Sequence, residues 1–184
     1  MHPIIVVAAS SGSLTPLKQI VSSLPRSCRA SLFIALHADP NQRILPALLS
    51  ALTDASVLHA ENATRIEPGH VYVAPPDHHM RLEEGRIRLD QEPKVNFARP
   101  AADPLFISAA ETYRERVVGI VLSGYGNDGA EGLRIIKEHG GSALVQDLDD
   151  AKVPEMPYAA LNADHPDAFL TAERLAERIA ALCA

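Results

Sequence analysis

Apolar residues follow two alternating patterns along this chain. Continuous apolar runs, typical of strands buried on both faces of a sheet, predict strands at residues 4–9, 31–37, 117–123 and 142–146. Elsewhere apolar residues recur every three or four positions, as on one face of a helix. This spacing, together with possible capping residues, predicts helices near residues 14–24, 40–52, 103–113, 128–139 and 171–182.

Residues 57–90 follow neither pattern over any length and contain only short strand-like segments, at 57–59, 70–74, 80–83 and 86–90. Glu84-Gly85 separates the last two, which predicts a small antiparallel hairpin. Strands that alternate with helices indicate right-handed crossovers and a mainly parallel sheet. We therefore expect residues 1–184 to form one doubly wound α/β domain, a three-layer αβα arrangement with helices on both faces and a hairpin insert.

Composition and charge narrow the classes of function. The 184 residues are 47% hydrophobic and 22% charged, which is a normal globular balance. A net charge of -6 argues against nucleic-acid binding, because neutralising phosphates requires clustered Lys and Arg. The apolar runs are too short to span a bilayer, and a first strand at Ile4 leaves no room for a signal peptide. These features predict a cytoplasmic protein without membrane insertion.

The two cysteines, Cys28 and Cys183, lie far apart in the sequence and match no metal-ligand spacing. We expect each to be a free thiol in a reducing compartment.

Three of the predicted strands are followed by reactive side chains: Ser10, His37 and Asp128. Ligands of open α/β sheets bind beyond the carboxyl ends of the strands, so these residues are expected at one edge. A serine hydroxyl needs an imidazole to take its proton and a carboxylate to orient that imidazole. A serine at the head of a helix also gains backbone N–H groups that can stabilise an oxyanion. The pattern predicts a serine hydrolase.

Each of these residues also has a purely structural interpretation. Ser10 or Ser13 can cap the first helix, Asp128 can cap a later helix, and His37 can be a hydrogen-bonded histidine at a strand end. Ala8 interrupts the G-x-S-x-G pattern of α/β-hydrolases, and the order Ser, His, Asp differs from the three common serine-hydrolase orders.

A competing motif occupies the same region as the aspartate. Gly124, Gly126 and Gly129 spell G-x-G-x-x-G, and Asp147 follows Gly129 by 18 residues, as in a dinucleotide-binding fingerprint. Against this alternative, Asp128 places a negative charge where a pyrophosphate would bind. The motif also comes late in the chain, whereas the fingerprint usually follows the first strand. Dinucleotide binding at Gly124–Gly129 is therefore the less favoured interpretation.

At these same turns the sequence resembles the catalytic domain of the CheB protein-glutamate methylesterases of bacterial chemotaxis. Residues 8–13, AASSGS, are similar to the family's G-A-S-T-G-G, and residues 36–40 are similar to its Q-H-M-P region. Residues 122–130, LSGYGNDGA, resemble L-T-G-M-G-N-D-G-A most closely. Weaker similarity at residues 68–75, 99–106 and 156–160 extends the resemblance over roughly residues 4–180.

The resemblance implies roles for the three reactive residues. Ser10 would be the nucleophile, His37 the general base and Asp128 the residue that orients the base. The implied oxyanion hole and substrate pocket comprise Ser11, Gly12, Tyr125, Gly126 and Asn127, with backbone N–H groups near Ser11 and Tyr125 as donors. The implied reaction removes methyl esters from γ-glutamyl side chains of methyl-accepting chemotaxis receptors, releasing methanol. Glutamine deamidation is a second implied activity, and no metal or organic cofactor is implied.

Several positions depart from the family's pattern. Ala8 and Ser13 replace glycines, Ser11 replaces a threonine, and Ala38 and Tyr125 replace methionines. A backbone donor survives a change of side chain, but the Tyr125 ring can narrow or cover the pocket. These changes bear on which methylated protein is the substrate, and a catalytically silent receptor-binding module is a further alternative.

The family's usual receiver domain has no counterpart in the sequence, whose first predicted strand already belongs to the catalytic domain. We expect the domain to work alone or with a regulator on a separate chain, such as a response regulator.

Overall fold

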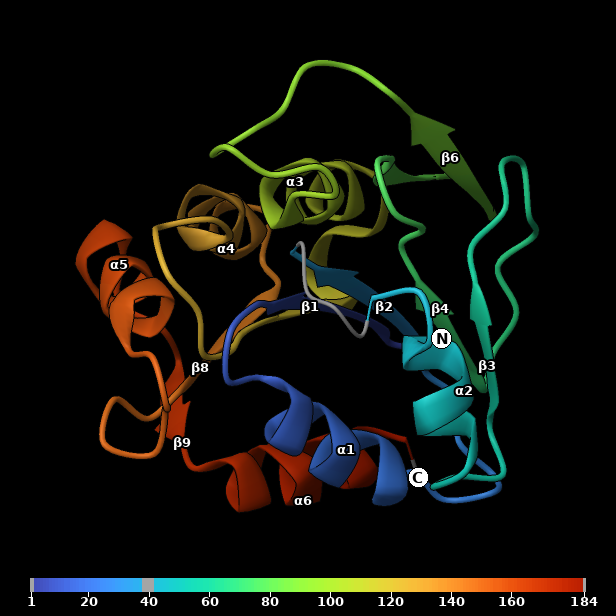
Figure 1. Cartoon of the computed structure of the whole chain (residues 1–184), viewed down its shortest axis with the longest axis horizontal. Coiled ribbons are helices and arrows are strands. Elements are labelled where there is room, and N and C mark those ends of the chain that lie inside the picture. Colours follow the sequence, from blue (N-terminus) through green and yellow to red (C-terminus); the bar gives the residue numbers. More distant parts are fainter. Residues whose placement is uncertain (1, 38–41, 184) are drawn as a thin grey trace.

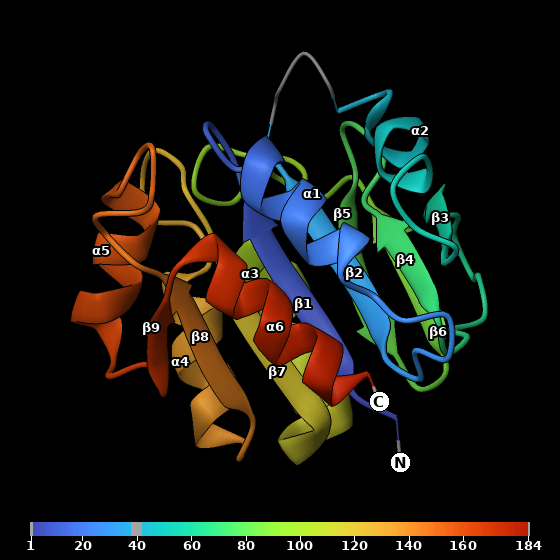
Figure 2. The same cartoon turned by 90° about the horizontal axis from the view of Figure 1, so that it is seen from below.

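A parallel sheet forms the centre of the computed structural model, which describes residues 2–37 and 42–183. Its seven strands are ordered β3-β4-β2-β1-β7-β8-β9 (Figures 1 and 2). The strands are β1 (Ile4–Ala9), β2 (Ser31–Leu36), β3 (Ser56–His59), β4 (His70–Val73), β7 (Val117–Val121), β8 (Ser142–Gln146) and β9 (Ala168–Leu170).

Helices cover both faces of this sheet, as Figure 1 shows. Helices α1 (Leu14–Ser22) and α6 (Ala172–Leu182) pack together on one face. Helices α3 (Ala102–Tyr113) and α4 (Ala130–Glu138) cover the other face, with α5 (Glu155–Ala163) beside α4. The short helix α2 (Leu45–Ser50) packs against β3.

Strand β1 explains why the central strands read as unbroken apolar runs. Ile4, Val6 and Ala8 belong to the core beneath α3 and α4. The alternate residues, Ile5, Val7 and Ala9, belong to the core beneath α1 and α6. Because successive side chains of a strand point to opposite faces, a sheet covered on both sides needs apolar residues at every position.

The predicted hairpin is formed by β5 (His79–Glu83) and β6 (Arg86–Asp90), which pair antiparallel and pack on α3. The doubly wound three-layer fold with a hairpin insert is confirmed. The start of the helix predicted from residue 40 falls outside the described residues. Helix α5 and strand β9 were not predicted.

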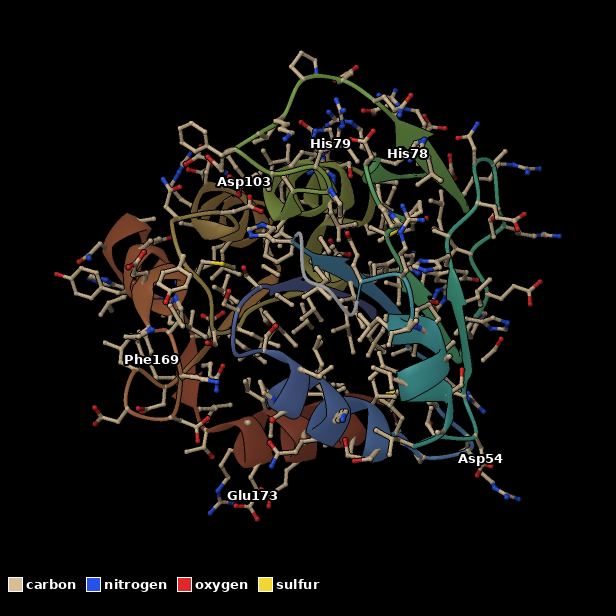
Figure 3. The ribbon with its side chains drawn as sticks, in the orientation of Figure 1. Asp54, His78, His79, Asp103, Phe169 and Glu173 are labelled. Carbon is tan, nitrogen blue, oxygen red and sulfur yellow. A yellow bond between two sulfur atoms is a disulfide. The ribbon has the colours of Figure 1, made fainter. Side chains whose placement is uncertain are left out.

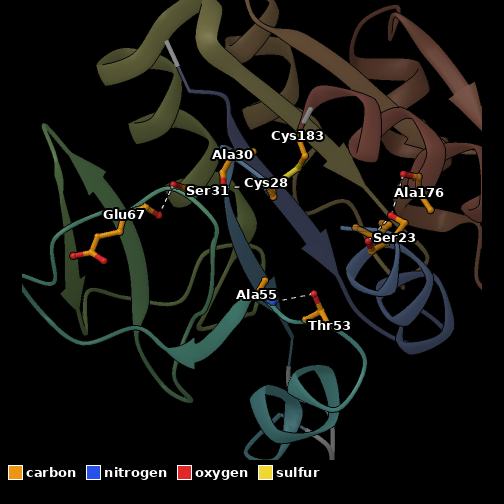
Figure 4. The surroundings of a disulfide bond; sticks show 10 residues. Ser23, Cys28, Ala30, Ser31, Thr53, Ala55, Glu67, Ala176 and Cys183 are labelled. Atoms are coloured by element: carbon orange, nitrogen blue, oxygen red, sulfur yellow. Dashed lines mark hydrogen bonds between the residues drawn. A yellow bond between two sulfur atoms is a disulfide. The ribbon is translucent and has the colours of Figure 1, made fainter. Parts of the chain in front are cut away.

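The prediction of two free thiols was wrong: Cys28 and Cys183 form a disulfide, with their Cα atoms 4.4 Å apart (Figure 4). Cys28 follows α1 and Cys183 follows α6, so the pairing of these two helices on one face brings the cysteines together. A separation of 155 residues hid this proximity in the sequence.

Within the two described ranges, no helix is both long enough and apolar enough to cross a membrane.

Candidate active site

Neighbouring strands bring the predicted nucleophile and base to the same edge of the sheet. Ala9 of β1 and Leu36 of β2 are the last paired residues of the two strands, and Ser10 and His37 follow them directly. The His37 backbone N–H donates to the Ala9 carbonyl at 3.0 Å. Strand β7 lies on the other side of β1, so the turn after β7 lies at the same edge of the sheet.

That turn contributes Asp128, which contacts the His37 ring. The distance between His37 Nε2 and Asp128 Oδ2 is 2.5 Å, and Asp128 is only 1% exposed. With Nε2 directed at the carboxylate, Nδ1 is the ring nitrogen left to accept a proton from a nucleophile. The predicted contact between these two residues is confirmed.

Ser10 lies where β1 turns into α1. Its N–H donates to the Ser123 carbonyl at 3.2 Å, and its own carbonyl accepts from the Ser13 N–H and hydroxyl. Neither serine side chain caps the helix, since Ser13 Oγ donates to Ser10 O at 2.5 Å. Among the described residues Ser10 Oγ forms no hydrogen bond, so the expected Ser10–His37 bond is not formed in this structure.

Gly124 allows the turn after β7 to pack directly on Ser10. A Cβ atom at Gly124 would lie 2.5 Å from Ser10 Cβ and 2.4 Å from Met156 Sδ, closer than real contacts allow. Gly12, at φ +81°, is equally confined, because a Cβ there would lie 2.6 Å from Ser123 Oγ. Glycine at these two positions therefore keeps the two turns in contact.

The backbone donors near Ser10 divide into two groups. Within the described ranges, the Ser11 and Tyr125 N–H groups donate to no other group, as a pair of oxyanion donors would require. Tyr125 is 63% exposed, and Asn127 in the same turn is also exposed. By contrast, the Gly126 N–H already donates to Glu155 Oε2 at 2.9 Å.

The same turn is poorly suited to a dinucleotide. Carboxylates occupy two of its glycine donors, because Gly129 N–H donates to Asp103 as Gly126 N–H does to Glu155. A pyrophosphate would have to displace both carboxylates and would face Asp128 as well. The arrangement does not favour the dinucleotide alternative.

Four donors surround the Asp128 carboxylate. Oδ1 accepts from Asp103 N–H at 3.1 Å and Asn96 Nδ2 at 3.0 Å, while Oδ2 accepts from Ala102 N–H at 2.5 Å besides contacting His37. Burial alone would raise the pKa of Asp128, but its bonds with His37, Ala102 and Asn96 outweigh burial and lower that pKa. Asp128 is thus held ionised, and it caps α3 rather than the helix that follows it.

Sequence reasoning missed two residues of this network, Asn96 and Asp103. Asp103 lies between α3 and α4 (Figure 3), where its Oδ1 accepts from Gly129 N–H at 3.1 Å and Gly132 N–H at 2.7 Å. Its Oδ2 accepts from Asn96 Nδ2 at 2.7 Å. Burial, and then the charge of Asp128, raise the pKa of Asp103. The sequence signal was an acid in the first turn of α3, which was assigned only to the start of its own helix.

No group of three or more His, Cys, Asp or Glu side chains within the described residues is arranged to hold a metal ion. The fold and the site together define a doubly wound α/β protein that presents a serine, a histidine and an aspartate at the carboxyl edge of its sheet.

Comparison with known proteins gives the family. The model of the CheB methylesterase family matches residues 5–179, and this chain belongs to that family. The crystal structure of the Thermotoga maritima CheB methylesterase catalytic domain superposes with a TM-score of 0.93 at 29% identity, covering 99% of each chain.

Curated relatives agree with this assignment. A Caulobacter vibrioides protein-glutamate methylesterase/protein-glutamine glutaminase is 37% identical over 96% of this chain, which spans 52% of that protein. The Myxococcus xanthus protein-glutamate methylesterase FrzG is 36% identical over 87% of this chain, which spans 48% of it. A Leptospira interrogans relative is 36% identical, and this chain covers 91% of its length. The chain therefore covers about half of some relatives and nearly all of another.

Proposed function

We propose that this protein is a serine hydrolase that removes methyl esters from γ-glutamyl side chains of a protein substrate. The observation that carries the proposal is the His37–Asp128 contact of 2.5 Å at the sheet edge where Ser10 follows β1. The family match over residues 5–179 supports it independently of that geometry.

In the proposed mechanism, Ser10 Oγ attacks the ester carbonyl carbon while His37 Nδ1 takes the hydroxyl proton. Asp128 holds the ring through Nε2 and stabilises the imidazolium that forms. Collapse of the tetrahedral intermediate breaks the bond to methoxide, which takes the proton from His37 and leaves as methanol. A water molecule then attacks the acyl-enzyme while His37 takes one of its protons, and that proton passes to Ser10 Oγ as the acyl bond breaks. The freed γ-carboxylic acid loses the water's second proton to solvent and becomes the carboxylate. A glutamine side chain would react in the same way and release ammonia.

The negative oxygen of the intermediate needs donors that are already in place. The N–H groups of Ser11 and Tyr125 are proposed for this role, and Gly12, Gly126 and Asn127 complete the pocket around them. Removing one such donor typically costs about 10² to 10³ in turnover. Because both are backbone groups, the substitutions at these positions relative to the family leave them intact.

The proposed substrates are methylated chemotaxis receptors, and the proposed location is the cytoplasm, where a receptor's methylated side chains would be reached. The relatives' names include glutamate methylesterase and glutamine glutaminase activity, and they support this substrate class. A response regulator on a separate chain is the proposed partner for regulation.

Methanol release from a methylated receptor tests the proposal directly. The wild-type protein should release methanol, and Ser10→Ala should reduce the rate by about 10⁶, as expected when a nucleophile is removed. Ser22→Ala is the matched control, because Ser22 lies exposed at the end of α1 and bonds only locally to the Gln19 carbonyl. Receptor binding without turnover in the wild type would instead support a silent binding module.

A further inference from the structure

Helices α3 and α4 exchange carboxylate caps beside the proposed site. Asp128, just before α4, accepts from the first N–H groups of α3, those of Ala102 and Asp103. Asp103, in the first turn of α3, accepts from Gly129 and Gly132 at the start of α4. Each carboxylate therefore fixes the helix that carries the other, and neither can shift alone.

The carboxylates of Asp103 and Asp128 are joined by one amide. Asn96 Nδ2 donates to Asp103 Oδ2 at 2.7 Å and to Asp128 Oδ1 at 3.0 Å. Two buried anions at this separation repel each other, and a shared donor offsets that repulsion without adding a charge that would compete with His37.

A tight turn presents Asn96 to both carboxylates. Val95 and Ala98 exchange backbone hydrogen bonds of 2.9 and 3.1 Å, with Asn96 and Phe97 at the tip. The two tip residues have φ values of +50° and +64°, a conformation that asparagine tolerates better than most residues. Asparagine thus suits this position both as a turn residue and as a donor, and the two roles can be separated experimentally.

We propose that Asn96 and Asp103 are positioning residues for Asp128. The Asn96 amide offsets the repulsion between the two carboxylates, and the exchanged helix caps keep the Asp128 carboxylate aimed at His37. They act through Asp128 and do not touch the reacting atoms. The proposal rests on the proposed hydrolase function only for its activity readout.

The Asn96 donor affects the pKa of both buried aspartates. Among the residues that the structure describes, the titratable groups that face Asp128 are His37 and Asp103, and the bond from Asn96 lowers the pKa of both aspartates. Removing that donor should raise the pKa of both. Asp128 would then take up a proton at a higher pH, and at any pH where it is protonated it would no longer hold His37 in the orientation that accepts the Ser10 proton.

Two substitutions at Asn96 test this inference. Asn96→Ala removes the donor, and Asn96→Asp keeps the size and the turn preference but replaces the donor with a third carboxylate. We expect the titration of Asp128, followed by carboxyl ¹³C NMR, to rise by roughly one pH unit in Asn96→Ala and further in Asn96→Asp. At a pH below the pKa of Asp128, the rate of ester hydrolysis relative to the wild type should fall by about tenfold in Asn96→Ala, and more in Asn96→Asp.

Asn62→Ala is the matched control, because Asn62 is also a loop asparagine whose side chain bonds elsewhere, accepting from Leu89 N–H at 2.9 Å. It should change neither readout. If the Asn96 amide does not act on Asp128, Asn96→Ala will titrate and react like the wild type, and this result would overturn the inference. A wild type without esterase activity would refute the proposed function, while the NMR titration would still decide the positioning role.

Discussion

Asp128 shows how much of a catalytic role is decided at the scale of one residue. Its carboxylate is almost completely buried, yet four groups from three segments of the chain donate to it or contact it. Such a network fixes the orientation of the His37 ring. The helix-cap interpretation of Asp128 is correct in one respect, but the helix it caps is α3.

Asp128→Asn should separate the orientation of His37 from the capping of α3. An amide can hold the imidazole in the wrong tautomer, and the corresponding change in serine proteases lowers turnover by about 10⁴. The amide also turns a donor toward existing donors, so we expect the free energy of unfolding to fall by about 1–3 kcal/mol. Turnover and urea unfolding measured on the same preparation check both values. Activity within tenfold of the wild type would remove Asp128 from the catalytic set.

The stability change caused by Asp128→Asn should depend on pH. The pKa of Asp128 is lowered in the folded protein, so its ionised form stabilises the fold above the ordinary aspartate pKa of about 3.9. This contribution is lost as the pH falls through the lowered pKa. The difference in unfolding free energy between wild type and variant should therefore be largest near neutral pH and shrink in acid.

The sequence identifies Ser10, His37 and Asp128 as candidates because strand ends can be read from apolar runs, and parallel strands share a carboxyl edge. Asn96 and Asp103 could not be found in this way. Their roles depend on how α3, α4 and the loop that carries Asn96 meet in space. The spacing of residues along the sequence does not predict those contacts.

At the scale of elements, the turn between β7 and α4 is held from both sides. Asp103 of α3 accepts from Gly129 N–H at the end of the turn. The segment that leads into α5 bonds to Gly124 at the start of the turn. Gly124 N–H donates to Val153 O and Gly124 O accepts from Met156 N–H, both at 2.9 Å. The proposed oxyanion donor at Tyr125 thus lies on a turn whose position is set by α3 and α5. Because α5 has a weak apolar pattern, the sequence predicted neither the helix nor this support.

Glu155→Ala tests the support from α5. Glu155 accepts from Gly126 N–H at 2.9 Å, one residue beyond Tyr125, so its loss should loosen the turn. We expect kcat/KM for ester hydrolysis to fall by roughly three- to tenfold with little change in melting temperature, since the bond is exposed. Glu173→Ala, at an exposed glutamate in the first turn of α6, is the control and should leave kcat/KM unchanged. Equal kinetics in both variants would mean that the turn keeps its position without Glu155.

At the scale of the whole molecule, the disulfide and the proposed active site lie at opposite ends of the strands. The proposed site follows the carboxyl ends of β1, β2 and β7, whereas Cys28 precedes the amino end of β2. Cys183 lies beside that end too, where its carbonyl accepts from Arg29 N–H at 3.2 Å. In Figure 2 both chain ends lie at this lower edge. The disulfide therefore ties the segment after α6 to the start of β2, away from the proposed active site.

A double substitution, Cys28→Ala with Cys183→Ala, should consequently affect stability and spare activity. A cross-link that closes a loop this long restricts the unfolded chain strongly, and its removal typically costs about 2–5 kcal/mol. We expect the urea midpoint to fall accordingly, while kcat/KM stays unchanged at temperatures where the variant is folded. Reduction of the wild type, unfolded in the presence of dithiothreitol, is the control: it breaks the cross-link without removing core atoms and should reproduce most of the loss. A reduced wild type with an unchanged midpoint would show that the bond does not constrain the chain, and a parallel loss of kcat/KM would show that the two edges are coupled.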